Sequence, residues 1–299
     1  MSRFNLALAQ FGVYAPRSWS DVEARLAREV TTAAAQGAKL LVFPEYAAMT
    51  LAALLPPAVQ GDLRGQIAHL QRFREDYLSL HRRLAREHGV YLLAGSFPWE
   101  VAPGRFRNRA FLCPPHEGRA DYQDKRVMTR FEREAWNIEG GAEIPLKVFD
   151  TALGALAIDI CYDVEFPALA AAQADTGAAL ILVPSCTDTL AGHHRVHVAA
   201  RARALENQCL VAVAPLVGAA PWSPAIDVNR GAAALYGPPD RGFPDDGLLA
   251  CGTLDQPGWV YAEVDLARVA QVRTEGQVFN FRHGREPAAG PAIVERRSL

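Results

Sequence analysis

The sequence predicts an α/β fold, because short apolar strands alternate with helical segments along the chain. Continuous apolar runs indicate strands that are buried on both faces of a sheet. The expected strands span residues 4–10, 40–43, 90–95, 154–160, 179–183 and 210–213. The expected helices span residues 19–35, 64–88, 166–174 and 195–208. This alternation predicts a layered α/β architecture.

Two of the expected helices have recognisable ends. The segment 19–35 opens on Ser20 and Asp21, which can cap a first turn, and it stops at Gly37. The segment 64–88 is long and amphipathic, and it ends at Gly89. The other two expected helices are rich in alanine, a strong helix former.

Length and charge limit the possible classes of function. The chain has 299 residues, half of them hydrophobic, so it can bury a sizeable core without disulfides or metal. Its net charge of -2 argues against a nucleic-acid partner or an anionic membrane surface, which need a basic face. No linker or internal repeat is visible, so we expect one domain over residues 1–285. The remaining residues, 286–299, are expected to form a C-terminal tail or dimerisation arm.

Cysteine usage indicates a reducing compartment. An odd number of cysteines without any CxxC pair does not predict a disulfide framework. They are Cys113, Cys161, Cys186, Cys209 and Cys251. Residues 1–4 show no signal-peptide features, and the apolar stretch 209–221 is too short to cross a bilayer as a helix. We therefore expect a soluble cytoplasmic protein.

Cys161 is a candidate nucleophile because it lies between an expected buried strand and an expected helix. Such a junction exposes the turn residue at the sheet edge and directs backbone N–H groups towards the atom it attacks. The thiol could instead be an ordinary buried cysteine, which is the commoner fate of this residue type. Cys186 also follows an expected strand and is the main rival.

Glu45 and Lys125 are further candidates. Glu45 follows the apolar strand 40–43, where burial can raise a carboxyl pKa into the range useful for proton transfer. Lys125 lies in the polar run 121–126. Taken singly, each residue is better explained as a surface charge.

Together, the three segments resemble the carbon–nitrogen hydrolase family, also called the nitrilase superfamily. The matching motifs are LLVFPEY with Glu45, YQDKR with Lys125 and IDICYDVEFP with Cys161, at spacings of 80 and 36 residues. The resemblance continues through NLALAQ, RNRAFL, ARALENQ and GAAALYGP. The runs PSCTDTLAGHHRV and PPDRGFPDDG resemble a poorly characterised bacterial branch, some members of which carry a fused acetyltransferase-like domain.

This resemblance implies a four-layer α-β-β-α sandwich with a Glu-Lys-Cys triad at the strand ends. Cys161 would form a thioester with the substrate, and Glu45 would act as the base. Lys125 and the backbone N–H of Tyr162 would stabilise the oxyanion. No metal or organic cofactor is implied.

A second glutamate between the lysine and the cysteine is also implied by the resemblance. Glu134 heads an E-x-W-x-x-x-G-G pattern similar to that of the amidase members, so it is preferred. Glu132 is the alternative.

The implied substrate is a small-molecule amide, with Tyr46, Trp136 and Thr187 expected to line its pocket. A homodimer or higher homo-oligomer is implied as well. Nitrile hydrolysis, carbamoyl cleavage and N-acyl transfer share this chemistry and stay open. A non-catalytic small-molecule-binding protein on the same fold is the alternative from a different class.

A histidine cluster provides one competing hypothesis. His193, His194 and His197 lie near an expected helix start, and two histidines on one helical face can bind zinc. The sequence lacks an HExxH pattern, so we expect these histidines to pack or to cap the helix instead.

Overall fold

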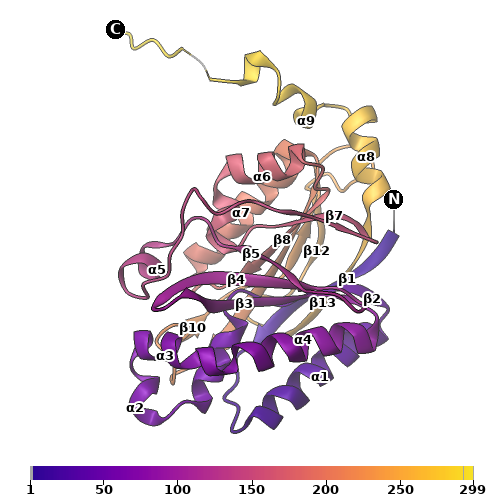
Figure 1. The fold of residues 1–299 in the computed structure, drawn as a ribbon. Coiled ribbons are helices and arrows are strands. Elements are labelled where there is room, and N and C mark those ends of the chain that lie inside the picture. The colour runs from indigo at the N-terminus through magenta and orange to yellow at the C-terminus, as the bar shows by residue number, and fades with distance from the viewer. Residues whose placement is uncertain (1–2, 292, 299) are drawn as a thin grey trace.

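Two β-sheets joined along one strand form the centre of the molecule (Figure 1). The computed structural model describes residues 3–291 and 293–298. Residues 1 and 2 of the N-terminal segment, and residues 292 and 299 of the expected tail, lie outside the described residues. The strand order is β5-β4-β3-β2-β1-β9-β8-β7-β6.

The strands fall into two groups that β1 connects. The first sheet contains β1 (Arg3–Gly12), β2 (Ala38–Val42), β3 (Tyr91–Ala102), β4 (Arg105–Cys113), β5 (Asp121–Asp124) and β13 (Gly258–Asp265). The second contains β6 (Val148–Thr151), β7 (Gly154–Ile158), β8 (Leu180–Ser185), β9 (Leu210–Ala219), β10 (Val228–Asn229), β11 (Ala234–Tyr236) and β12 (Leu248–Cys251). The sheets meet where Phe11 and Gly12 of β1 pair with Leu216 and Val217 of β9.

Helices cover the outer face of each sheet, which completes four layers in the order α-β-β-α. On the first sheet lie α1 (Trp19–Ala35) and α4 (Arg74–His88), and on the second lie α6 (Pro167–Asp175) and α7 (Leu190–Asn207) (Figure 1). Leu6, Leu40 and Leu93 of the first sheet share one apolar core with Leu156 and Leu182 of the second. The predicted α/β sandwich is therefore confirmed.

The predicted helix over residues 64–88 is wrong as a single element. It is divided into α3 (Leu63–Leu70), the 3₁₀ turn η2 (Gln71–Phe73) and α4. The Gln71 side chain ties this turn to β3, because its Nε2 donates to the Pro98 carbonyl and its Oε1 accepts from the Glu100 N–H at 3.0 Å. Such tertiary contacts override helix propensity.

Helix α1 has the predicted bounds, but its N-cap and the start of α7 differ from the sequence prediction. Ser18, rather than Ser20, caps α1, since its side chain accepts from the Asp21 N–H at 3.2 Å. Helix α7 begins at Leu190, five residues earlier than expected, because Thr189 provides an N-cap. The sequence did not predict β4, β5, β6 and β13, because polar residues interrupt their apolar pattern. It also did not predict β10, β11 and β12, which are only two to four residues long.

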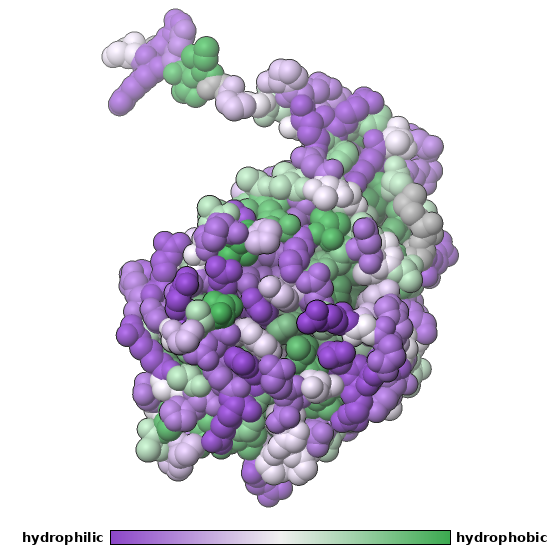
Figure 2. Space-filling view, in the orientation of Figure 1, coloured by the Kyte–Doolittle hydropathy of each residue, from purple (hydrophilic) through white to green (hydrophobic). Residues whose placement is uncertain are grey.

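The remaining helices are short and lie between the strands or near the C-terminus. These are η1 (Ala47–Leu54), α2 (Pro57–Gln60), α5 (Arg130–Glu134), η3 (Cys161–Glu165), α8 (Leu266–Glu275), α9 (Asn280–His283) and η4 (Pro287–Ala289). The C-terminal segment projects from the body (Figure 2), and Ile293 and Val294 are 98% and 88% exposed. No helix in residues 3–291 or 293–298 is long and apolar enough to cross a bilayer.

Candidate active site

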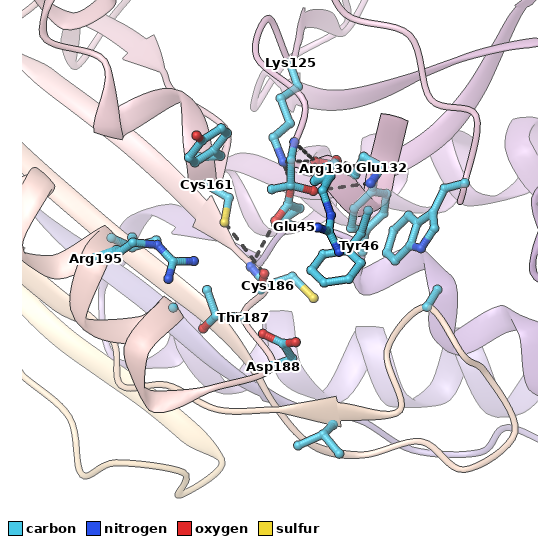
Figure 3. A pocket seen from close by; sticks show the side chains of 18 of the residues that line it. Glu45, Tyr46, Lys125, Arg130, Glu132, Cys161, Cys186, Thr187, Asp188 and Arg195 are labelled. Carbon is cyan, nitrogen blue, oxygen red and sulfur yellow. Dashed lines mark hydrogen bonds and ion pairs between the residues drawn. The ribbon is translucent and has the colours of Figure 1, made fainter. Parts of the chain in front are cut away.

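A cavity of about 540 Å³ opens where strands of both sheets end (Figure 3). Glu45 follows β2, Lys125 follows β5, and Cys161 follows β7, and all three line the cavity. Cys186, which follows β8, lines it too. The structure therefore brings together three candidates that are far apart in the sequence.

Glu45 is held by a turn whose backbone is left-handed. The next residue, Tyr46, has φ 55° and starts η1. Its N–H donates to Ser96 Oγ at 2.9 Å, which fixes the turn against β3. Non-glycine residues adopt this conformation uncommonly, so the turn is an enforced feature that directs the Glu45 carboxylate into the interior.

Cys161 occupies a similar left-handed turn, with φ 49°, at the start of η3. Ser185 Oγ donates to Cys161 Sγ at 3.5 Å, and the thiol lies 3.7 Å from the Cys186 carbonyl oxygen. The main chain of Cys186 also contacts the acid, since its N–H donates to Glu45 Oε2 at 3.1 Å. One peptide segment therefore positions the thiol and the carboxylate together.

Asp163 links the cysteine turn to the lysine segment. Its carboxylate accepts from the Val127 N–H at 2.8 Å and from the Arg126 N–H at 3.1 Å. Because these N–H groups directly follow Lys125, the buried Asp163 fixes that segment relative to Cys161.

Lys125 lies between two buried carboxylates. Its Nζ donates to Glu45 Oε1 at 2.8 Å and to Glu132 Oε2 at 2.7 Å. All three side chains are at most 3% exposed. Charges buried this deeply need such pairing.

The structure places Glu132, and not the expected Glu134, beside Lys125. Glu132 is the carboxylate beside Lys125, whereas the exposed Glu134 lies 3.5 Å from the exposed Arg130. The capping box of α5 explains the difference. Thr129 caps the helix and Glu132, at its third position, reaches back to the Thr129 N–H at 2.9 Å.

The pKa values of the two carboxyl groups shift in opposite directions. Burial raises the pKa of Glu45, and the charge of Glu132 adds to this effect, so the opposing Lys125 charge does not cancel it. Burial would also raise the pKa of Glu132, but the Lys125 charge and hydrogen bonds from Lys125 and Tyr46 outweigh it and lower the pKa. Glu132 is thus the fixed anion, and Glu45 is the group better suited to exchange a proton.

The Cys161 thiol is protonated at rest near neutral pH. Burial raises its pKa, and the Glu45 charge raises it further, which outweighs the opposing charge of Lys125. A thiol in this state needs an adjacent base before it can act as a nucleophile.

The expected pocket residues lie where the sequence predicted. Tyr46, Trp136 and Thr187 line the cavity, as does Tyr162, the residue after Cys161. The Tyr46 ring also packs against Trp136 at 5.0 Å. That these residues bind substrate stays a prediction.

The sequence prediction missed two buried polar contacts, those of Asn108 and Ser185. Asn108 Nδ2 donates to Glu45 Oε1 at 2.8 Å and to Glu132 Oε1 at 3.1 Å. A signal was present, because Asn108 shares the buried face of β4 with Phe106 and Ala110. A polar residue on the apolar face of a strand indicates a buried partner.

The histidine cluster packs at the start of α7. The rings of His193 and His197 lie 4.1 Å apart, and His197 Nδ1 lies 2.7 Å from the Tyr236 hydroxyl. In the part of the chain that the structure describes, no group of three or more His, Cys, Asp or Glu side chains could hold a metal ion.

Comparisons with known proteins identify the family. The family model described as carbon–nitrogen hydrolase matches residues 5–274. The chain is 34% identical over 212 residues to the probable hydrolase YhcX of Bacillus subtilis (strain 168), covering 71% of this chain but 40% of YhcX. It is 28% identical over 286 residues to omega-amidase NIT2 of Homo sapiens, covering 93% of this chain and 95% of NIT2.

The fold has a close match among solved structures. A carbon–nitrogen hydrolase from Helicobacter pylori G27 superposes with a TM-score of 0.76 at 19% identity, over 95% of each chain. This likeness supports the fold, and the family-model match over residues 5–274 shows that the chain belongs to the carbon–nitrogen hydrolase family and is an enzyme of that class.

Proposed function

We propose that the protein is an amidase that hydrolyses the carbon–nitrogen bond of a small carboxamide, with Cys161 as nucleophile. The observation that best supports this is the Lys125 ammonium, held between Glu45 and Glu132 in the wall that carries the thiol. A thiol, a base and a fixed cation are what acyl transfer from nitrogen requires. The likeness to a relative named as an amidase supports an amide substrate.

In the first step, Glu45 accepts the thiol proton while Cys161 Sγ attacks the amide carbon. The new S–C bond forms as the carbonyl electron pair moves onto oxygen. Because the resting thiol is protonated, proton transfer accompanies the attack. The turn at Cys161 holds the sulfur at the cavity wall for this purpose.

The negative oxygen of the tetrahedral intermediate is stabilised by two donors. A lysine ammonium has three N–H groups, and Glu45 and Glu132 take two of those of Lys125, which leaves one for the substrate oxygen. The second donor is the backbone N–H of Tyr162, in the first turn of η3, where helical N–H groups lack intrahelical partners. Each such donor contributes about 3–4 kcal/mol to the transition state.

The intermediate then collapses and the thioester is hydrolysed. The C–N bond breaks, the leaving nitrogen takes the proton from Glu45, and ammonia or an amine departs. A water molecule gives its proton to Glu45 and attacks the thioester carbon. The C–S bond breaks, the sulfur regains the proton from Glu45, and a carboxylic acid leaves. The sequence of steps uses no metal or organic cofactor.

Ammonia release from small carboxamides, nitriles and N-carbamoyl compounds tests the proposal. We expect release from amides by the wild type and loss of turnover, with the fold kept, in Cys161→Ala. A matched control is Cys113→Ala, which removes another buried thiol outside the cavity. Turnover that survives Cys161→Ala but not Cys186→Ala would assign the nucleophile to Cys186. Release from nitriles or carbamoyl compounds alone would replace the amidase assignment, and silence of a folded protein across the whole panel would contradict it.

We also propose a homodimer or higher homo-oligomer in a reducing, cytoplasmic setting. The free thiols of the five cysteines support the reducing environment. Sedimentation equilibrium tests the oligomeric state, and a single species at 32.5 kDa would contradict the proposal.

A further inference from the structure

The Asn108 side chain lies between the two carboxylates of the site and contacts both. Its Nδ2 is 2.8 Å from Glu45 Oε1 and 3.1 Å from Glu132 Oε1. The residue is fully buried on the inward face of β4. It therefore bridges the two acids from a buried position that is not part of the cavity lining.

The orientation of this amide is dictated by charge. Both neighbours are acceptors, so only the NH₂ group of Asn108 can face them. Its two N–H bonds serve one carboxylate each, whereas Oδ1 is buried without a hydrogen-bond partner among the described residues. An unpaired buried acceptor is costly, and the two donated hydrogen bonds are what offset it here.

Two negative charges meet one positive charge in this cluster, so neutral hydrogen-bond donors are needed to stabilise the second anion. Two carboxylates face a single ammonium, that of Lys125. Glu132 has several further hydrogen-bond donors. Its carboxylate also accepts from the Tyr46 hydroxyl at 2.7 Å and from the Thr129 N–H and hydroxyl, both at 2.9 Å. It keeps its charge with or without Asn108.

Glu45 has fewer donors and depends more on Asn108. Apart from Asn108, Lys125 and the Cys186 N–H donate to its carboxylate at 2.8 and 3.1 Å. The titratable groups that face it from neighbouring elements are Tyr46, Lys125, Glu132, Cys161 and Cys186. Of these, only Lys125 carries a positive charge.

We propose that Asn108 is a positioning residue that keeps Glu45 ionised beside a second ionised carboxylate, so that Glu45 can take the Cys161 proton. This inference rests on the proposed function, in which Glu45 is the base. Without the Asn108 donor, the negative charge of Glu132 would favour protonation of Glu45, and the base would be lost at a pH where the wild type still works.

The test is the pH dependence of Cys161 alkylation by iodoacetamide, with the Cys161→Ala protein subtracting reaction at other thiols. Asn108→Leu removes both donors at similar volume, and Asn108→Asp replaces them with acceptors at the same shape. We expect the acid limb of the alkylation rate to move to higher pH by about one unit or more in each variant, as for loss of a hydrogen bond to a charged group. The acid limb of kcat/KM for ammonia release should move with it.

A double variant tests whether Asn108 acts by offsetting the charge of Glu132 or only by filling space in the core. Asn108→Leu combined with Glu132→Gln removes the like charge that Asn108 offsets, so the acid limb should return towards lower pH. A matched control is Asn207→Asp, at a buried asparagine whose Nδ2 donates to the Arg203 carbonyl at 3.1 Å, and it should leave the limb in place.

The role of Asn108 and the amidase activity are contradicted by different results. A wild-type acid limb in folded Asn108 variants, with the rate lowered equally at every pH, would overturn the role of Asn108. If the single variants do not fold, the double variant decides: an acid limb in the folded double variant that stays about one unit or more above that of the wild type would overturn the role of Asn108 as well. Since alkylation needs no substrate, an absence of ammonia release from every amide would count against the amidase alone.

Discussion

Lys125 Nζ lies 2.8 Å from Glu45 Oε1, although 80 residues separate the two in sequence and both side chains are at most 2% exposed. The same ammonium contacts Glu132. This arrangement joins stability to function, because the cation that would stabilise an oxyanion also holds two buried carboxylates in the core.

Lys125→Met should therefore destabilise the fold as well as abolish turnover. Removing one partner of a buried ion pair costs about 3–5 kcal/mol, since the remaining charges are left unpaired. The free energy of unfolding in urea at pH 7 measures this cost. Lys147→Met is the matched control, because Lys147 forms a 2.7 Å pair with the exposed Asp121, and surface pairs contribute about 0–1 kcal/mol. Equal losses in the two variants would contradict the prediction.

Glu132→Gln should lower kcat by about 100-fold, as expected when a catalytic group is misplaced by about 1 Å. The neutral amide no longer holds Lys125 by charge, so the ammonium loses its fixed position. Glu134→Gln, two residues away and exposed, should stay within about twofold of the wild type. Steady-state kinetics on the best amide of the panel compares them. A larger loss in Glu134→Gln would restore the assignment that the sequence favoured.

This pair of glutamates shows where the sequence prediction reached its limit. Glu45, Lys125 and Cys161 were predictable as a set because their three motifs together resemble the carbon–nitrogen hydrolase family. The expected strands 40–43 and 154–160 also placed Glu45 and Cys161 at strand ends, whereas the polar run 121–126 gave no such signal for Lys125. The E-x-W-x-x-x-G-G pattern favours Glu134 over Glu132, although Glu132 is the residue that lies beside Lys125. The signal for Glu132 was the Thr129-x-x-Glu132 capping box, which turns that side chain back towards the helix start.

The remaining differences arise from contacts between distant segments. Asn108 acquires its role only when β4 lies beside the Glu45 turn, and no local pattern names its partners. Likewise, the break between α3 and α4 depends on hydrogen bonds from Gln71 to β3. The buried parallel strands were predictable because their apolar runs are continuous, whereas strands that are very short or carry polar residues were not.

The neutral variant Asp159→Asn should be more stable than the wild type at high pH. Burial raises the pKa of Asp159 to about 8 from its usual 3.8, and the nearby Asp163 charge adds to the shift. The unfolded chain thus ionises first, so the contribution of Asp159 to stability is full below pH 4 and is lost as pH rises towards 8. The neutral isostere lacks this loss, and at pH 9 it should be more stable than the wild type by at least about 2 kcal/mol.

Urea unfolding at pH 4 and pH 9 measures the effect, with little difference expected at the lower pH. Asp150→Asn, at an exposed position of β6, is the control and should leave the pH dependence unchanged. A variant of Asp159 that tracks the wild type at both pH values would show that this group is ionised in the native state throughout.

Gly95→Ala should disturb the turn that carries Glu45. Gly95 has φ +71°, and an added Cβ would collide with the carbonyl oxygen of Pro44, the residue before Glu45. Gly89→Ala is the matched control, because Gly89 has φ +60° but its added Cβ would meet nothing within 4 Å. Left-handed backbone alone costs an alanine about 1–2 kcal/mol. Gly89→Ala should lose only that amount of stability and keep its kcat.

Gly95→Ala should lose more stability than Gly89→Ala, because the clash adds to the backbone strain, and its kcat should fall as the Glu45 carboxylate moves away from the thiol. Thermal or urea unfolding gives the first quantity, and ammonia release by the folded variant gives the second. If both alanine variants lost equal stability and kept full kcat, the close contact between β3 and the Pro44 carbonyl would not be what positions the base.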